Sequence, residues 1–235
     1  MSVGPFWRYY GGKWRAAVRY PEPQHRQIIE PFAGAAGYAC RYPDCDVLLI
    51  DRDPVIIAIW QYLISATPAD VLNIGDIPDG GTVDDLDAPQ AARWLAGFWC
   101  NAGVPRPRKR PSIWAQASGG WSQWARARIA ADVPRIKHWR AICADYTAAP
   151  DVPATWFIDP PYQGRAGRHY RCNAVDYCAL GHWTKQRQGL VIACEQAGAT
   201  WLPWSKQLAV KGTRGTSREV VYIRDDLELW SIQRS

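Results

Sequence analysis

Three short apolar runs constrain the fold most strongly, because each leads directly into an acidic residue or a proline. Val47–Ile50 reads VLLI and precedes Asp51, and Thr155–Asp159 reads TWFID. Gln27–Glu30 (QIIE) stops at Pro31. Continuous apolar runs of this length, without polar alternation, predict parallel strands in a sheet that is covered on both faces. The residues that follow each run would then lie at the carboxyl edge of that sheet.

Helical segments are predicted between and after these strands. A helix is expected at Gly37–Tyr42, and Pro54–Ile64 (PVIIAIWQYLI) has the length and apolar density of another, with proline at its start. Strand, glycine turn, helix, strand and acid together are typical of a nucleotide-binding α/β sheet. Further helices are predicted at Ala91–Cys100 and Lys185–Gln196, and a late strand at Glu219–Ile223 (EVVYI).

The segment Val104–Arg140 interrupts this pattern and is predicted to be an insertion. It holds nine Lys or Arg against one Asp, with four of the fourteen tryptophans, and the whole chain has a net charge of +6. Basic side chains interleaved with aromatic ones suit a nucleic-acid surface, although a solvated loop with core tryptophans could have the same composition. We therefore expect a catalytic domain of residues 1–103 and 141–235 and an inserted recognition region of residues 104–140.

Length and composition limit the class of protein. With 235 residues, 48% of them hydrophobic, the chain can form one α/β domain with an inserted piece. It has no apolar run long enough to span a membrane and no signal-peptide pattern, so a cytoplasmic location is expected. The seven cysteines are scattered and never form C-x-x-C, which predicts reduced packing residues and no metal site.

The run Glu30–Gly37 (EPFAGAAG) is a candidate ligand loop. Gly34 and Gly37 let a turn pass close to a ligand, and the following helix would present free N–H groups. The fingerprint G-x-G-x-x-G is not met, so the loop need not hold a pyrophosphate. Asp51 follows about twenty residues later, where a ribose-binding acid belongs, although it could also cap a helix. Together these features favour an adenosine-bearing cofactor.

The turn Asp159–Tyr162 (DPPY) carries the strongest chemical signal. A proline pair can simply end a strand, but here it follows a carboxylate at the edge of the sheet where ligands bind. The carboxylate and a prolyl carbonyl are two acceptors that match the two donors of an exocyclic NH₂ group. Holding both hydrogens would free the nitrogen lone pair for attack, and the Tyr162 ring could stack on the base.

FWRYYGGKWR, EPFAGAAG, LLIDRDP and IDPPY, in this order, resemble the Dam-type DNA adenine-N6 methyltransferases over most of the chain. The resemblance implies a Rossmann-like fold with a mostly parallel sheet and a late antiparallel hairpin. It implies S-adenosylmethionine as methyl donor and a target-recognition region where the basic segment lies. The partner would be duplex DNA with its target adenine flipped out, and the enzyme would be a monomer or weak dimer that uses no metal and no covalent intermediate.

The resemblance also implies roles for particular residues. The cofactor-binding residues would be Tyr9, Lys13, Pro31, Phe32, Ala33, Gly34, Ala35, Asp51, Asp145, Tyr146 and Asp159. The catalytic residues would be Asp159, Pro160, Pro161 and Tyr162. We predict DNA contacts at Arg106, Arg108, Lys109, Arg110, Trp114, Trp121, Arg126, Arg128, Tyr170 and Arg214. The glycine loop departs from the family, which has G-x-G where this chain has Gly34-Ala35-Ala36.

Other functions remain open from the sequence. Cytosine-N4 methyltransferases usually have serine in place of Asp159, and protein-glutamine methyltransferases usually have asparagine. An adenine-N6 methyltransferase acting on RNA needs the same pocket. An inactive DNA-binding module on this scaffold is a further alternative, against which the intact Lys13, Asp51 and Asp159 argue. A solitary methylase, a restriction partner and a phage enzyme would all have this sequence pattern.

Overall fold

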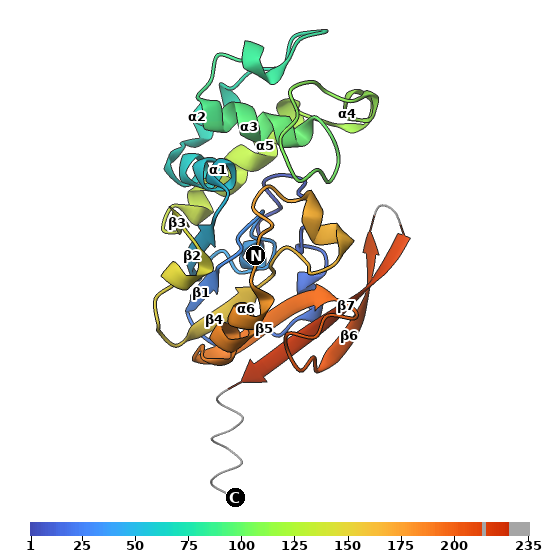
Figure 1. The fold of residues 1–235 in the computed structure, drawn as a ribbon. Helices are drawn as coiled ribbons and strands as arrows, with labels where there is room; N and C mark the ends of the chain where they lie inside the picture. The colour runs from blue at the N-terminus through green and yellow to red at the C-terminus, as the bar shows by residue number, and fades with distance from the viewer. Residues whose placement is uncertain (213–214, 226–235) are drawn as a thin grey trace, which may run out of the picture.

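Within residues 1–212 and 215–225, which the computed structural model describes, seven strands form one sheet in the order β3-β2-β1-β4-β5-β7-β6 (Figure 1). Strands β1 to β5 are parallel, β7 is antiparallel to β5, and β6 is antiparallel to β7. This Rossmann-like sheet with a late antiparallel hairpin confirms the predicted fold class. The strands are β1 Gln27–Glu30, β2 Asp46–Asp51, β3 Arg140–Cys143, β4 Ala154–Ile158, β5 Gly189–Gln196, β6 Lys206–Gly212 and β7 Gly215–Asp225.

The helices connect these strands and are mostly short. The α-helices are α1 Pro54–Ser65, α2 Pro68–Leu72, α3 Gln90–Trp99, α4 Ile113–Ser118, α5 Gln123–Asp132 and α6 Tyr177–Lys185. Single turns of 3₁₀-helix are η1 Ala17–Arg19, η2 Ala39–Arg41, η3 Val83–Asp85, η4 Val133–Ile136, η5 Tyr146–Ala148 and η6 Arg165–His169. Helix α1 starts where it was predicted because Asp53 caps it, accepting a hydrogen bond from Val55 N at 3.0 Å, and Pro54 needs no donor. None of the described helices combines the length and apolarity needed to cross a membrane.

The core lies on both faces of the sheet, as the continuous apolar strands predict. Alternate residues of a strand point to opposite faces, and the buried residues divide accordingly into two clusters. One cluster joins the sheet to α1, α3 and α5, and its strand residues include Ile28, Leu49, Phe157 and Ile192. The other joins the sheet to α6 through Leu180, and its strand residues include Ile29, Leu48, Trp156 and Val191.

Two predicted helices are wrong. Lys185–Gln196 was expected to be helical, but α6 ends at Lys185 and β5 occupies Gly189–Gln196. The run Gly189–Glu195 is buried throughout and pairs with β4 on one side and β7 on the other, so burial in the sheet outweighs any helical preference. The helix expected at Gly37–Tyr42 is only the turn η2, because the chain passes through positive φ at Ala36 just before it.

The order of the strands places the candidate motifs. β1 pairs with β2 on one side and with β4 on the other, so the direction in which strands are added reverses between β1 and β4. Loops that leave neighbouring strands at such a switch point diverge and open a crevice at the carboxyl edge. The glycine loop follows β1 and Asp159 follows β4, so both motifs lie at this crevice.

The segment predicted as an insertion packs against the helices that precede it. Figure 1 shows α2, α3, α4 and α5 gathered at the top of the view, away from β6 and β7. Helix α2 packs against α5, and Trp121 Nε1 donates to Gly75 O at 2.9 Å. The backbone N–H of Arg108 donates to Gly97 O at 3.0 Å. The division at residues 104–140 stays a prediction, since these contacts join the segment to the residues before it.

A comparison of two alanines tests whether the glycine loop holds a strained residue. Ala36 and Ala39 are both fully buried, but only Ala36 has a positive φ, of 46°. Either alanine-to-glycine change removes one buried methyl group and raises the conformational entropy of the unfolded chain, and both effects lower stability. Only Ala36→Gly also relieves a left-handed conformation that disfavours alanine by about 1–2 kcal/mol. We expect Ala36→Gly to be more stable than Ala39→Gly by about that amount in urea unfolding; equal losses would contradict the strain.

Candidate functional site

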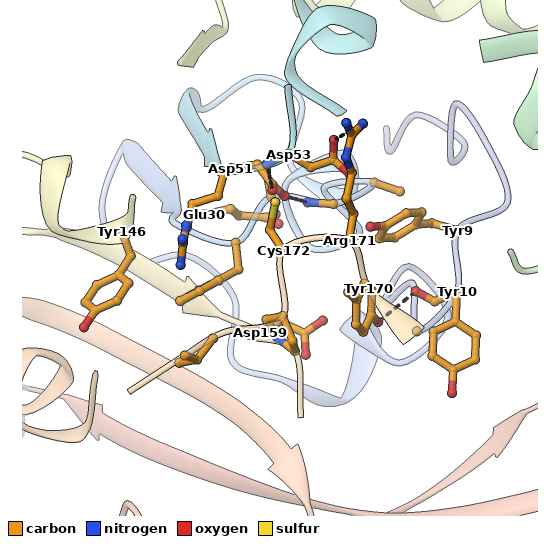
Figure 2. Close-up of a pocket in the computed structure, with 18 of the residues that line it drawn as sticks. Tyr9, Tyr10, Glu30, Asp51, Asp53, Tyr146, Asp159, Tyr170, Arg171 and Cys172 are labelled. Carbon is orange, nitrogen blue, oxygen red and sulfur yellow. Dashed lines mark hydrogen bonds and ion pairs between the residues drawn. The ribbon is translucent and has the colours of Figure 1, made fainter. Parts of the chain in front are cut away.

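A cavity of about 310 Å³ lies at the carboxyl edge of the sheet, between the loops that leave β1, β2 and β4. Figure 2 shows Asp51 and Asp53 on one side of it, Asp159 on the opposite side, and Tyr146 at one end. The predicted cofactor residues that line it are Tyr9, Lys13, Phe32, Ala33, Gly34, Ala35, Asp51, Asp145, Tyr146 and Asp159. Pro31 is not among the lining residues. The volume falls within the range of small-molecule pockets.

The glycine loop is shaped by the N-terminal strap, residues 9–14, which crosses it. Gly34 has a φ of 44°, and a Cβ there would lie 2.9 Å from the Tyr9 ring. A Cβ on Gly37 would lie 2.5 Å from Trp14 N, so any side chain at this position would displace the strap backbone. The shifted glycine spacing thus has a structural reason: Gly37 admits the strap.

Asp51 connects the glycine loop to the start of α1. Its Oδ2 accepts a hydrogen bond from Gly34 N at 3.0 Å, and its Oδ1 accepts one from Asp53 N at 2.9 Å. Burial raises the pKa of Asp51 to about 6, against the lowering effect of these N–H donors. Each carboxylate oxygen can accept a second hydrogen bond, so Asp51 retains acceptor capacity toward the cavity.

Asp159 forms a buried ion pair with the strap. Lys13 Nζ lies 2.8 Å from Asp159 Oδ1 and donates a hydrogen bond to Oδ2 at 2.9 Å, and it also donates to Gly11 O at 3.1 Å. Burial raises the pKa of Asp159 to about 6 although the Lys13 ammonium opposes the shift. Asp159 Oδ1 is buried and faces the Lys13 ammonium at 2.8 Å, and a carboxylate oxygen with one such partner can accept a further hydrogen bond. An acceptor left in this state beside a cavity is suited to a ligand N–H.

Glu219 on β7 is a central residue of the site that sequence reasoning missed. It is buried, its Oε2 accepts a hydrogen bond from the Tyr162 hydroxyl at 2.9 Å, and its Oε1 accepts one from the Tyr20 hydroxyl. The same Oε2 lies 3.6 Å from Lys13 Nζ. The Glu219 carboxylate thus joins Tyr162, in the turn after β4, to Lys13 and Tyr20 near the N-terminus. An acidic residue inward-facing on a predicted strand was the signal that could have found it.

The turn Asp159–Tyr162 is predicted to be catalytic and is called the catalytic turn below; only some of its residues reach the cavity. Pro161 lines the cavity, and its carbonyl accepts a hydrogen bond from the Tyr177 hydroxyl at 2.5 Å. Pro160 and Tyr162 do not line the cavity; Pro160 is buried and Tyr162 is half-buried. Lys13 Nζ lies 4.8 Å from the centroid of the Tyr162 ring, so an ammonium covers one face of the ring. Any stacked base would have to use the other face.

Aromatic and charged residues complete the cavity. The rings of Phe32 and Tyr146 stack with their centroids 5.5 Å apart, forming a flat apolar wall, and Asp145 caps η5 beside it. Three bases, Lys13, Arg52 and Arg171, line the cavity against the acids Asp51, Asp53, Asp145, Asp159 and Asp176; Glu30 lines it too, but burial raises its pKa to about 8, so it adds little negative charge at pH 7. The cavity is therefore negative and favours a cationic ligand over a polyphosphate.

The basic run of the insertion is exposed, but its members differ. Arg106 and Arg108 have no ion pair within the described residues. Lys109 pairs with Asp84 at 2.6 Å, and Arg110 Nη1 donates to Gly80 O at 2.7 Å. Trp114 is 37% exposed, and the Arg8 guanidinium lies 4.6 Å from its ring centroid.

Several predicted DNA contacts have other partners in the structure. Arg126 is buried and pairs with Asp76 at 2.6 Å, so it has no face toward solvent. Arg128 donates to Pro5 O at 2.6 Å, and Trp121 is held by Gly75 as described above. Tyr170 lines the cavity and donates to Tyr10 O at 3.1 Å. Arg214 lies outside the described residues.

The structure also shows the state of the cysteines and the spacing of possible metal ligands. All seven cysteines are free. Within residues 1–212 and 215–225, His, Cys, Asp and Glu side chains form no group of three or more placed to hold a metal ion.

Comparison with known proteins does not assign a family or an activity to the chain. No family model matches the chain, and no curated protein matches it. Among solved structures it is similar to yhhF from Escherichia coli, which is named as a methyltransferase. The two are 14% identical, the match covers 91% of this chain and 81% of that chain, and the TM-score is 0.36. Function is therefore argued from the residues of this chain.

Removing Glu219 tests whether the buried charge cluster supports the fold. Glu219→Ala leaves the buried Lys13 with one carboxylate fewer and two hydroxyls without an acceptor, which should lower the free energy of unfolding by about 3–5 kcal/mol. Arg218→Ala, at an exposed neighbour on the same strand, should change it by less than about 0.5 kcal/mol. Urea unfolding of both variants measures the difference. If the Glu219→Ala and Arg218→Ala variants were equally stable, Glu219 would not support the fold.

Proposed function

We propose that this chain is an S-adenosylmethionine-dependent methyltransferase that acts on the N6 amino group of adenine in DNA. The observation that carries the proposal is the state of Asp159. It is a carboxylate at a strand end, beside a cavity at the switch point of the sheet, and Lys13 fixes it in place while it keeps the capacity to accept a further hydrogen bond. A site that orients an amino group for attack requires such an acceptor.

The cavity fits the proposed methyl donor. S-adenosylmethionine carries a sulfonium and an ammonium, and the excess of acidic side chains favours a cation there. A dinucleotide would bring a pyrophosphate to the same acids and would be repelled. The remaining acceptor capacity of Asp51 suits the two hydroxyls of a ribose, and the wall formed by Phe32 and Tyr146 suits an adenine ring.

The chain's own residues account for the positioning of the target. S-adenosylmethionine, when bound, supplies an electrophilic methyl group. Asp159 Oδ1 would accept a hydrogen bond from the target amino group, with the Pro160 carbonyl as second acceptor, so that the nitrogen lone pair points into the cavity. Lys13 holds the Asp159 carboxylate in place and favours its charged form, although burial opposes ionisation. Catalysis would therefore rest on orientation and fixed charge.

Exposed residues of the insertion support DNA as the substrate. Arg106 and Arg108 are exposed, and Ile113 and Trp124 on the neighbouring helices are 85% and 63% exposed. Guanidinium groups can bind phosphates, and exposed aromatic rings can stack on bases. Arg126 and Arg128 are omitted from this surface, because their guanidinium groups already bind Asp76 and the backbone of Pro5.

Asp159→Asn tests the catalytic assignment. We choose this change over Asp159→Ala because Lys13 is buried against Asp159, and alanine would leave the ammonium without its main partner. Asparagine keeps the size of the side chain but removes the charge that holds Lys13 and faces the amino group. We expect turnover with tritiated S-adenosylmethionine and plasmid DNA to fall by about 10²-fold or more.

The matched control is Asp46→Asn, an exposed acid at the amino end of β2, and it should keep wild-type turnover. If Asp159→Asn kept within about tenfold of wild-type turnover, Asp159 would not be the catalytic acceptor. Wild-type protein is assayed in parallel on duplex DNA, single-stranded RNA and protein. Digestion of the labelled product to nucleosides then separates N6-methyladenine from N4-methylcytosine.

The basic run provides an internally controlled test of DNA binding. Arg106→Ala with Arg108→Ala removes two unpaired cations, and each phosphate contact contributes about 0.9 to the slope of log K against log salt. The slope should therefore become shallower by about 2. Lys109→Ala with Arg110→Ala removes two cations already bound to Asp84 and Gly80, so it should change the slope less. If both double variants had the wild-type slope, the basic run would make no phosphate contacts and would be only a solvated loop.

A further inference from the structure

A second hollow, the outer groove, lies beside the catalytic turn and plays no part in the function proposed above. Its volume is about 500 Å³, and it lies between residues 163–169 after the catalytic turn and residues 195–199 at the end of β5. Tyr10 lines both the outer groove and the first cavity, so this residue lies at the boundary between them. Tyr10 is held from one side: its ring meets the edge of His169 at 5.5 Å, and its carbonyl accepts the Tyr170 hydroxyl (Figure 2).

The floor of the outer groove is polar but unsuited to an anion. Glu195 is fully buried there and accepts hydrogen bonds from Gln163 N at 3.1 Å and from Trp201 Nε1 at 3.0 Å. A phosphate would be repelled by this carboxylate. Beside it the exposed side chains of Gln163 and Gln196 offer amide donors and acceptors, and Tyr10 offers a ring. An uncharged, flat ligand with donors and acceptors on its edge, such as a nucleobase, matches these groups.

The rim of the outer groove has the opposite character. The loop 164–172 reads GRAGRHYRC, with three arginines and no acid. Arg165 and Arg168 are exposed, and neither forms an ion pair with the part of the chain that the structure describes. The third, Arg171, faces the first cavity, 3.8 Å from Asp53. Arg165 lines the groove and Arg168 follows it on η6, and two unpaired guanidinium groups placed there match the phosphates that flank a nucleobase.

The loop is fixed to the catalytic turn. A Cβ on Gly167 would lie 1.9 Å from Tyr162 O, so only glycine allows the loop to pack this closely. On its far side Arg52 Nη1 donates to Ala174 O at 2.9 Å. Because of these contacts, a phosphate bound by Arg165 or Arg168 would be held at a set distance from Asp159.

Resting on the proposed function, we propose that the outer groove binds the nucleotide next to the target adenine on the same DNA strand. Its base lies against Tyr10 and the two glutamine amides, and its phosphates lie on Arg165 and Arg168. The target base lies at Asp159, at the mouth of the first cavity, and Tyr10 separates it from the neighbouring base. The groove therefore contributes to strand capture, separately from the recognition region.

The test compares two double variants. Arg165→Ala with Arg168→Ala removes the rim, whereas Arg26→Ala with Lys185→Ala removes two exposed cations beside the amino ends of β1 and β5, opposite the site. Binding to duplex DNA is measured against salt with S-adenosylhomocysteine present. The rim variant should have a slope shallower by about 2, and the control variant should keep the wild-type slope. Calorimetric affinity for S-adenosylhomocysteine should be the same in all three proteins, since the first cavity is untouched.

A second measurement locates the contact. Once the methylated adenine has been mapped in plasmid DNA, each nearby phosphate is replaced in turn by a neutral methylphosphonate. Wild type should lose affinity when a phosphate flanking the target is neutral, and the rim variant should be indifferent to that change. The proposal for the outer groove would be overturned if the rim variant kept the wild-type salt slope. It would also be overturned if the rim variant lost as much affinity as wild type when a flanking phosphate is neutral. A rim-dependent slope in a protein that methylates no DNA would instead refute the proposed function and leave the groove as a strand-binding site.

Discussion

The buried contact between Lys13 and Asp159 is the interaction on which the rest of the site depends. Burial alone would lower the pKa of the Lys13 ammonium, but the Asp159 and Glu219 carboxylates reverse this and hold it above its usual value. Removing three charged groups from water is unfavourable unless each finds partners, and here hydroxyls of Tyr20 and Tyr162 and the carbonyl of Gly11 supply them. The cluster joins the strap, β4 and β7, so the cavity has walls from three distant parts of the chain.

The parts of this structure that the sequence could predict are those governed by short-range pattern. Strands β1, β2 and β4 and helix α1 fall where continuous apolar runs, proline and a capping aspartate indicate them. β5 was mistaken for a helix because the break at Gly189, which has a φ of 95°, was overlooked and its pairing with β4 and β7 decides its conformation. Glu219 was missed for a related reason, since Lys13 and Tyr20 come from the other end of the chain and Tyr162 from the turn after β4, so its partners cannot be read from the neighbouring sequence.

The predicted site residues illustrate the same division. Motif residues that follow strand ends, such as Asp51 and Asp159, lie at one cavity because the sheet topology brings strand ends together. In the basic insertion, composition gave no such guidance. Arg126 and Arg106 look alike in the sequence, yet one is buried against Asp76 and the other is exposed. A charge count describes a segment, but only the fold separates side chains that hold the protein together from those available to a partner.

The connection between the strap and β7 also affects how the protein is made. A chain leaves the ribosome from its N-terminus, at about 5–20 residues per second. The strap is synthesised first, but Glu219 belongs to the last strand of the sheet, so Lys13 waits for most of translation before its second carboxylate appears. Contacts between such distant residues form slowly because the intervening loop must close. Until β7 joins the sheet, the Lys13–Asp159 pair therefore lacks the second carboxylate that completes its charge cluster.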